Sequence, residues 1–449
     1  MNKYRKPELS GHFQKRKSSA IRAAQIEFHK RKDLVQAINL AIGNVSLPMH
    51  PAMIQRLSDL RAQGSPFQNG AVRYTPTVGM DETREAFRHI IASSGFDVDR
   101  LHVQITDGGS QAMELVILGV CGDVGTADRP LMIIDPTYTN YTAMADRLGR
   151  STVAITRTLQ ENSRFTLPDL SLIEQTILES KPGALLVIPY DNPTGQLYSR
   201  TQMMKLAELC VRHDLWMISD EAYRELYYTD GDLTSIWGIT DRDVPGIEGR
   251  RISVETSSKV WNACGLRIGA LVSDNEEFHS RAVAENTANL CPNAIGQYIF
   301  GALAGVPAEE LRRWYDRQRE YYRSLLGEFT SLIREALPGI IVSSPDAAIY
   351  SVVDVRRIVA EDFDAMEFVL YCAREGVVQV EGKQYTLLVA PMSGFYDLPP
   401  EENPGRTQMR IAYVEPIDRL RLAPKLFKEL LQGYLKQPAQ NTLAVAVHR

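Results

Sequence analysis

The chain has 449 residues, whereas one domain typically has roughly 150, so we expect a large lobe and a smaller one. Hydrophobic residues make up 44% and charged residues 23%, which excludes a disordered or collagen-like chain. The net charge of −5 gives no indication of nucleic-acid binding, and no apolar run reaches the ~18 residues that a membrane helix requires. We therefore expect neither a nucleic-acid nor a membrane partner.

From residue 101 to residue 274, short β-branched runs alternate with amphipathic stretches. This pattern predicts strands at 101–105, 130–135, 151–156, 184–189, 215–219, 251–255 and 266–273, and helices at 111–121, 141–148, 167–180 and 201–213. Strands that alternate with helices indicate an α/β fold, with a mostly parallel central sheet and helices on both faces. In such a sheet, ligands bind beyond the carboxyl ends of the strands.

The last third of the chain predicts a smaller α+β domain. Residues 307–337 should form one long helix that stops at Pro338-Gly339, followed by strands at 340–342, 347–352, 377–380 and 409–413. Segment 37–41 is expected to return to this domain from the amino-terminal side. We therefore predict three parts: an arm and a segment on the small domain at 1–50, a large domain at 51–310, and the small domain at 311–449.

The first 32 residues are rich in basic residues: they contain ten Lys and Arg, and their only acidic residues are Glu8 and Glu27. We interpret this arm as solvated and partly ordered, with a targeting or polyanion-binding role as the alternative. The five cysteines lie far apart without a CxxC pair, which predicts reduced thiols and a cytoplasmic location. The histidines are scattered and no HExxH occurs, so we expect no metal site.

Polar groups follow four of the predicted strands. Gly108-Gly109-Ser110 stands where a helix begins, and the free amides of a helix start attract an anion such as phosphate. A plain turn with Ser110 as the helix N-cap is the structural alternative. Asn192 follows a buried strand, and Asp220 ends another, where a carboxylate needs a cation or a protonated ring. The alternative for Asp220 is that it caps the next helix.

A lysine, Lys259, lies in a hydroxyl-rich turn after the strand at 251–255, and Arg267 is eight residues further on. Such a lysine suits a Schiff-base nucleophile whose pKa falls through partial burial and a neighbouring arginine. A lysine, a carboxylate, an anion cradle and an aromatic face are together what pyridoxal phosphate requires.

At this point the chain resembles the fold type I pyridoxal-phosphate enzymes, specifically the class I/II aminotransferases of the aspartate aminotransferase superfamily. The resemblance runs from about residue 18 to 434 and rests on six ordered motifs, at 74–79, 108–112, 192–195, 219–223, 258–259 and 265–269. It implies transfer of an amino group between an L-amino acid and a 2-oxo acid in a ping-pong cycle.

Two other functions are compatible with these motifs. A lyase or cyclising enzyme of the same fold, with β-elimination or capreomycidine-type chemistry, would use the same residues. A non-catalytic binding module with this fold is the second alternative. It is weakened because Lys259, Asp220 and Arg410 are all present.

The resemblance also implies the cofactor contacts. Lys259 forms the imine with pyridoxal 5′-phosphate and then acts as the general base, and Asp220 keeps the pyridine nitrogen protonated. Asn192 and Tyr223 bind the 3′-oxygen. The remaining cofactor contacts are Tyr138, stacked on the ring, and a phosphate cradle of Gly109, Ser110, Thr256, Ser258 and Arg267.

Substrate and subunit contacts follow from the same resemblance. Arg410 would bind the substrate α-carboxylate through two parallel hydrogen bonds, with an ordinary strand-end ion pair as the alternative. Gly43 and Asn44 would close over that carboxylate. Tyr74 would reach the phosphate of a neighbouring subunit, which implies a homodimer with shared sites. For Tyr74 and Tyr138 the alternative is core or interface packing.

Two features depart from the pattern of the family. No second arginine for a dicarboxylate side chain is identified, so a preference for aspartate is unsupported. Trp261 and Asn262 are bulkier than the residues of many members, and we expect them to shape the pocket.

Overall fold

The computed structural model describes residues 7–16, 20–230 and 234–437. Its largest element is a seven-stranded sheet with the order β2-β10-β9-β8-β7-β3-β4. The strands are β2 (His102–Thr106), β3 (Leu131–Asp135), β4 (Thr152–Thr156), β7 (Ala184–Val187), β8 (Trp216–Asp220), β9 (Arg251–Thr256) and β10 (Gly269–Ser273). Each lies within two or three residues of its predicted position. From β9 to β4 the neighbours are parallel, as expected, whereas β10 is antiparallel to both β2 and β9.

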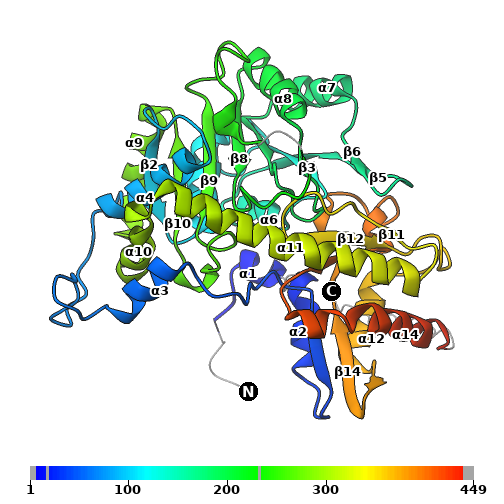
Figure 1. The fold of residues 1–449 in the computed structure, drawn as a ribbon. Helices are drawn as coiled ribbons and strands as arrows, with labels where there is room; N and C mark the ends of the chain where they lie inside the picture. The colour runs from blue at the N-terminus through cyan, green and yellow to red at the C-terminus, as the bar shows by residue number, and fades with distance from the viewer. Residues whose placement is uncertain (1–6, 17–19, 231–233, 438–449) are drawn as a thin grey trace, which may run out of the picture.

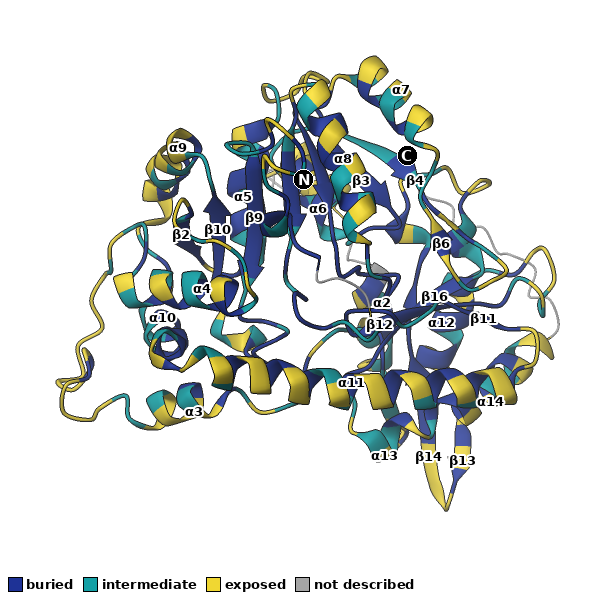
Figure 2. Ribbon diagram, turned by 45° about the horizontal axis from the view of Figure 1, so that its top comes forward, coloured by how far each residue is buried: buried dark blue, intermediate teal, exposed yellow. Residues whose placement is uncertain are grey.

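Side chains on alternate strand positions fill two separate hydrophobic cores, one on each face of the sheet. On β3, Leu131 and Ile133 face one core, and Met132 and Ile134 face the other. The first core is closed by α5 (Gly109–Val120), α6 (Asn140–Arg147) and α9 (Glu276–Asn286), and the second by α4 (Asp81–Ser93), α7 (Leu170–Ser180) and α8 (Arg200–Arg212), among others. Figure 2 shows the buried strands between helices whose outer faces are exposed. The predicted α/β architecture is thus confirmed.

A long helix, α11 (Ala308–Ala336), links this sheet to the second part of the molecule (Figure 1), as the sequence predicts. An antiparallel sheet there contains β11 (Ile341–Val342), β12 (Tyr350–Asp354), β16 (Gln408–Ala412) and β15 (Ala390–Pro391). A further sheet contains β1 (Gln36–Asn39), β14 (Lys383–Leu388) and β13 (Val378–Val380). Because β1 pairs with β14, the segment near residue 37 does return to this part. The sequence analysis did not predict β14 or β15.

The remaining elements cover the two bodies of the molecule, which are the large sheet with its helices and the second part with its two smaller sheets, or form the amino-terminal arm. They are α1 (Gly11–Lys15), α2 (Ala20–Phe28), α3 (Pro51–Ser58), α10 (Ala294–Gly301), α12 (Ala365–Arg374), α13 (Ile417–Leu420), α14 (Ala423–Leu435) and the short pair β5 (Thr158–Leu159) and β6 (Phe165–Thr166). No helix within the described ranges is long and apolar enough to cross a membrane.

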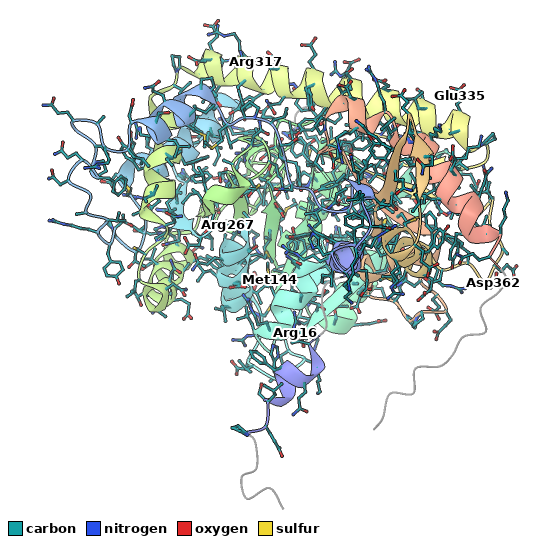
Figure 3. The ribbon with its side chains drawn as sticks, turned by 90° about the horizontal axis from the view of Figure 1, so that it is seen from below. Arg16, Met144, Arg267, Arg317, Glu335 and Asp362 are labelled. Carbon is teal, nitrogen blue, oxygen red and sulfur yellow. The ribbon has the colours of Figure 1, made fainter. Side chains whose placement is uncertain are left out.

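The amino-terminal arm lies across both bodies. Arg16, at the end of α1, forms an exposed ion pair with Asp146 on α6, with 3.1 Å between the charged atoms. Figure 3 shows Arg16 close to Met144, which also lies on α6. The next helix, α2, packs on α12 and β15 of the second part. Residues 1–6 and 17–19 of the predicted basic arm lie outside the described residues.

The carboxyl end of β3 is a point where the two bodies meet. Asp135, only 1% exposed, accepts a hydrogen bond from the backbone amide of Asp397 at 2.5 Å, and the amide of Thr137 donates to the carbonyl of Phe395 at 3.0 Å. Burial raises the pKa of Asp135 to about 7. The folded protein therefore holds a proton here that an unfolded aspartate loses near pH ~3.9.

We expect Asp135→Asn to stabilise the protein at alkaline pH. Asparagine keeps an oxygen for the amide of Asp397 but cannot ionise. Because the folded pKa is raised, wild-type stability falls as pH rises from about 4 to about 7 and stays low above that range. The melting temperature of the variant should exceed that of the wild type by a margin that widens from about pH 5 to about pH 8. A wild type that melts higher than the variant at the alkaline end would contradict this assignment.

Candidate active site

The carboxyl ends of β7, β8 and β9 meet at one edge of the large sheet. Their parallel register places Val187 beside Ser219, and Asp220 beside Val254. A cavity of about 250 Å³ opens there. Its lining includes twelve of the fourteen residues predicted for the site: Gly43, Gly109, Ser110, Tyr138, Asn192, Asp220, Tyr223, Thr256, Ser258, Lys259, Arg267 and Arg410. The exceptions are Asn44 and Tyr74, which do not line the cavity; Asn44 is exposed, and Tyr74 is 80% exposed.

Lys259 is half-buried on the loop that joins β9 to β10. This loop is closed at its base by Ser257, whose backbone amide and side-chain hydroxyl both donate to the carbonyl of Ile268, at 2.9 and 3.0 Å. The Nζ of Lys259 donates to the carbonyl of Gly43 at 2.5 Å. A nucleophilic amine therefore faces the cavity from a fixed loop and is held by a segment that precedes the large sheet in the sequence.

Asp220 is held by two hydrogen bonds at the floor of the cavity. Its Oδ1 accepts the amide of Ala222 at 3.0 Å, and its Oδ2 accepts the hydroxyl of Tyr141. Burial raises the pKa of Asp220, whereas the hydrogen bond from Tyr141 and the charge of Lys259 act to lower that pKa. Only a turn follows Asp220, so the alternative in which it caps a helix does not hold.

Tyr141 is a site residue that the sequence analysis missed. It lies on α6, three residues after Tyr138, and the two rings meet edge to face with centroids 5.5 Å apart. Burial raises the pKa of Tyr141 well above its ordinary value, so its hydroxyl is a proton donor. The i, i+3 spacing of two tyrosines at a helix start was the signal that could have found it.

The start of α5 forms an anion cradle with the loop that holds Lys259. The helix begins at Gly109, after Gly108, whose φ is +84°. A Cβ at Gly108 would lie 2.4 Å from Nη2 of Arg267, so only glycine lets the guanidinium come this close. The hydroxyls of Thr256 and Ser258 lie 2.7 Å apart on the same wall. Because the N-cap is Gly108, the alternative in which Ser110 is the N-cap is wrong.

Arg410 is a buried cation without a carboxylate partner. Its side chain is 2% exposed, Nη1 donates to Oδ1 of Asn192 at 2.9 Å, and Nη2 donates to the carbonyl of Ala41 at 2.7 Å. Within the part of the chain that the structure describes, its Nε has no hydrogen-bond partner and no carboxylate pairs with the guanidinium. The alternative of a strand-end ion pair therefore does not hold. A buried, unpaired charge is costly, which fits a site built for an anionic ligand.

The turn that carries Asn192 is fixed by a buried ion pair. Arg157 and Asp191 lie 2.6 Å apart, both almost fully buried, and the hydroxyl of Thr194 donates to the same carboxylate oxygen. Arg157 also donates to the carbonyl of Pro136 at 3.0 Å, which ties this turn to the segment that bears Tyr138. The ion pair thus orients two walls of the cavity.

Three further outcomes concern the rim and the surroundings of the cavity. Arg22, on α2, lines it, is exposed, and forms no ion pair with any residue that the structure describes. The sequence analysis did not identify Arg22 as a residue of the site. Trp261 and Asn262, expected to shape the pocket, do not line it: Trp261 stacks on Trp314, and Asn262 donates to the carbonyl of Pro48.

The lining groups suit a phosphorylated, ring-shaped aldehyde. One cavity is lined by an amine, a carboxylate, aromatic side chains and an anion cradle in which Arg267 lies against Gly108. Within the described residues no group of three His, Cys, Asp or Glu could hold a metal ion. The groups that line the cavity therefore fit pyridoxal 5′-phosphate.

Comparisons with known proteins identify the family. The sequence matches the family described as aminotransferase class I and II over residues 35–407. It is 27% identical over 322 residues to aspartate/prephenate aminotransferase of Thermus thermophilus, which covers 70% of this chain and 77% of that protein. It is 25% identical over 296 residues to aspartate aminotransferase of Streptomyces avermitilis, covering 65% and 67%. The structure of N-succinyldiaminopimelate aminotransferase from Mycobacterium tuberculosis shares the fold, with a TM-score of 0.77 at 20% identity over 94% of this chain and 100% of that chain.

This chain belongs to the class I and II aminotransferases. It is an enzyme that uses pyridoxal 5′-phosphate to move an amino group between an amino acid and a 2-oxo acid. The lyase or cyclising alternative is not favoured, because the relatives are aminotransferases.

Proposed function

We propose that this aminotransferase carries out both half-reactions in the described cavity, with Lys259 as nucleophile and Arg410 as the clamp for the substrate α-carboxylate. The observation that carries the proposal is the buried guanidinium of Arg410, which has no counter-ion among the described residues and lines the same cavity as Lys259. The family match ends at residue 407, so the role of Arg410 is supported by its geometry. Gly43 lies beside the clamp, where its loop would cover the bound carboxylate.

The cofactor, when bound, supplies an electron sink for the substrate Cα. Lys259 Nζ is the nucleophile towards its aldehyde and, once released by the amino substrate, the base that moves a proton from Cα. Asp220 would hold a proton on the ring nitrogen, and the hydrogen bond from the hydroxyl of Tyr141 favours the ionised form of this carboxylate. Asn192 and Tyr223 would hydrogen-bond the 3′-oxygen.

The other predicted cofactor residues position the ring and the phosphate. Tyr138 would stack on the ring. The first amides of α5, at Gly109 and Ser110, and the side chains of Ser110, Thr256, Ser258 and Arg267 would hydrogen-bond the phosphate.

We also propose a homodimer with shared sites. Tyr74 is 80% exposed, and the hydroxyl of Thr77 donates to the carbonyl of Leu290 at 2.7 Å, which brings two exposed apolar stretches together. These two stretches carry the exposed apolar side chains of Val72, Tyr74 and Leu290, the kind of side chain that a second copy can bury. Burial of these side chains by a second copy would bring Tyr74 to the phosphate cradle of that copy.

Two further proposals complete the description. The division into 1–50, 51–310 and 311–449 is supported by the separate sheets and by the pairing of β1 with β14. A cytoplasmic location is supported by the five cysteines, all of which are free thiols.

Lys259→Ala should abolish covalent attachment of the cofactor. The wild type, incubated with pyridoxal 5′-phosphate, should form an adduct that borohydride traps, and mass spectrometry should locate it at Lys259. An amino acid alone should convert the bound cofactor stoichiometrically to its amine form, and a 2-oxo acid should reverse the change. The variant should keep its circular dichroism spectrum and lose both signals. Turnover by the variant would refute the role of Lys259, and sustained release of ammonia by the wild type would favour the lyase alternative.

Tyr141→Phe should reduce kcat by roughly ten- to a hundred-fold, the factor for loss of one hydrogen bond to a charged group. Without the hydroxyl, Oδ2 of Asp220 has no donor within the described ranges, so the pKa of Asp220 rises. Tyr228→Phe is the matched control, because the hydroxyl of Tyr228 donates to the carbonyl of Ala348, away from the cavity. Equal losses in the two variants would show that Tyr141 acts through stability alone.

Two inactive variants should restore activity when they are mixed. Lys259→Ala lacks the nucleophile but keeps Tyr74, whereas Tyr74→Ala keeps Lys259. If each site combines the lysine of one subunit with the tyrosine of the other, a hybrid dimer contains one complete site. Unfolding and refolding the two together should recover up to about a quarter of wild-type activity, from random pairing of subunits. Recovery no greater than the sum of the separate variants would contradict shared sites.

A further inference from the structure

Tyr350 connects four segments of the site, and nothing in the sequence motifs points to it. It begins β12, is 2% exposed and lines the cavity. Its hydroxyl lies 2.9 Å from the hydroxyl of Tyr223, and the guanidinium carbon of Arg410 lies 4.3 Å from the centroid of its ring. The same side chain therefore contacts the clamp for the carboxylate and the tyrosine assigned to the 3′-oxygen of the cofactor.

The backbone around Tyr350 leaves it little freedom. A Cβ at Gly43 would lie 2.1 Å from the Tyr350 hydroxyl, so the loop backbone lies directly against that oxygen. A Cβ at Gly195 would lie 2.0 Å from the carbonyl oxygen of Tyr350, so the turn that carries Asn192 lies against its backbone. Both neighbours can only be glycine at this distance.

Tyr350 and Arg410 are also held side by side. They lie on adjacent antiparallel strands, since Tyr350 pairs with Ala412, and Arg410 pairs with Val352. The ring of Tyr350 offers its face to the guanidinium, which is a cation–π contact between desolvated groups. A change in the position of the clamp is therefore transmitted to the phenol.

The hydrogen bond between the two tyrosines has one direction that suits the proposed function. A phenol has a single proton to donate. If Tyr223 donates its proton to the 3′-oxygen of the cofactor, then the Tyr350 hydroxyl must be the donor to Tyr223. A hydrogen bond donated by Tyr350 to the Tyr223 hydroxyl strengthens the hydrogen bond that Tyr223 donates to the 3′-oxygen, because successive hydrogen bonds polarise one another.

We propose that Tyr350 is a positioning residue that couples the substrate-carboxylate clamp to the cofactor, its ring carrying Arg410 and its hydroxyl supporting Tyr223. This inference rests on the proposed function, because it uses the roles of Arg410 and Tyr223 given there. The contact between Arg410 and Asn192 is a direct link between clamp and cofactor, and Tyr350 provides a second, independent one.

The position of Tyr350 has an electrostatic consequence. Burial by itself would raise the pKa of Tyr350, but the positive charges of Lys259 and Arg410 outweigh burial and lower that pKa. A phenol with a lowered pKa is a stronger hydrogen-bond donor. In the complex Arg410 remains as the positive charge that favours this donor, which would stabilise the anionic 3′-oxygen through Tyr223 and so disfavour protonation of the imine that Lys259 forms.

The test is a pH titration of the visible absorption of the holoenzyme, with Tyr350→Phe and Tyr413→Phe compared with wild type. Phenylalanine at 350 keeps the ring under Arg410 and removes only the hydroxyl. The Tyr413 hydroxyl bonds Ser351 at 2.6 Å, next to the same strand pair but outside the cavity. The imine pKa should rise by about 0.5 to 1 unit in Tyr350→Phe, the equivalent of one net hydrogen bond. It should not change in Tyr413→Phe.

Coupling to the clamp is tested by adding propionate, a carboxylate without an amino group. In wild type, the negative charge on Arg410 should raise the imine pKa, and in Tyr350→Phe this rise should be clearly smaller. A double variant with Tyr223→Phe should show the same imine pKa as Tyr223→Phe alone, because Tyr350 acts through Tyr223.

Several outcomes would overturn the inference: an unchanged imine pKa in Tyr350→Phe, an undiminished response to propionate, additive effects in the double variant, or an equal shift in Tyr413→Phe. Failure of the proposed function has a different signature. In that case the wild type itself would show no titrating visible band, or no amino acid would convert it.

Discussion

The parallel register of β7, β8 and β9 is the constraint on which the site depends. It brings the turn after β7, the last residue of β8 and the loop after β9 to one edge of the sheet. Asn192, Asp220 and Lys259 are far apart in the sequence and share a cavity for this reason. A shift of register by one residue would turn each strand's side chains to the opposite face and would separate them. The two hydrophobic cores, which are filled by alternate residues of each strand, hold that register in place.

Charge is arranged around the cavity so that ligands complete it. Asp220 is supported by the hydroxyl of Tyr141, whereas Arg410 is buried among neutral oxygens and Arg267 lies against the amino-terminal end of α5. The amine of Lys259 lies between these groups. An isolated buried charge lowers the stability of the folded protein. An anionic substrate and a phosphorylated cofactor would neutralise the positive charges of this site when they bind. The folded protein is less stable for holding these charges in place, and in return the groups are already positioned for binding, as in other preorganised active sites.

The second part of the molecule supplies several of the residues that line the cavity. Arg410 and Tyr350 come from its four-stranded sheet, Gly43 comes from the segment after β1, and the arm brings Arg22 to the rim. Lys259 donates to Gly43, and Tyr350 bonds Tyr223, so these two groups of the large body, Lys259 and Tyr223, are each held by a group from the other part. Any motion of one part against the other therefore acts directly on the hydrogen bonds around the cofactor.

The sequence by itself determined the seven strands of the large sheet, four of the helices that cover it, the long helix α11 and twelve residues that line the cavity, because periodicity and short motifs are local properties of the chain. It did not predict β14, the antiparallel direction of β10, or the contributions of Tyr141, Tyr350 and Arg22. Those residues have no motif around them, and what makes them important is the group they meet, Asp220 for Tyr141 and Tyr223 for Tyr350. Only the tertiary structure decided these pairs, since they join segments that are distant in the sequence and are set by packing.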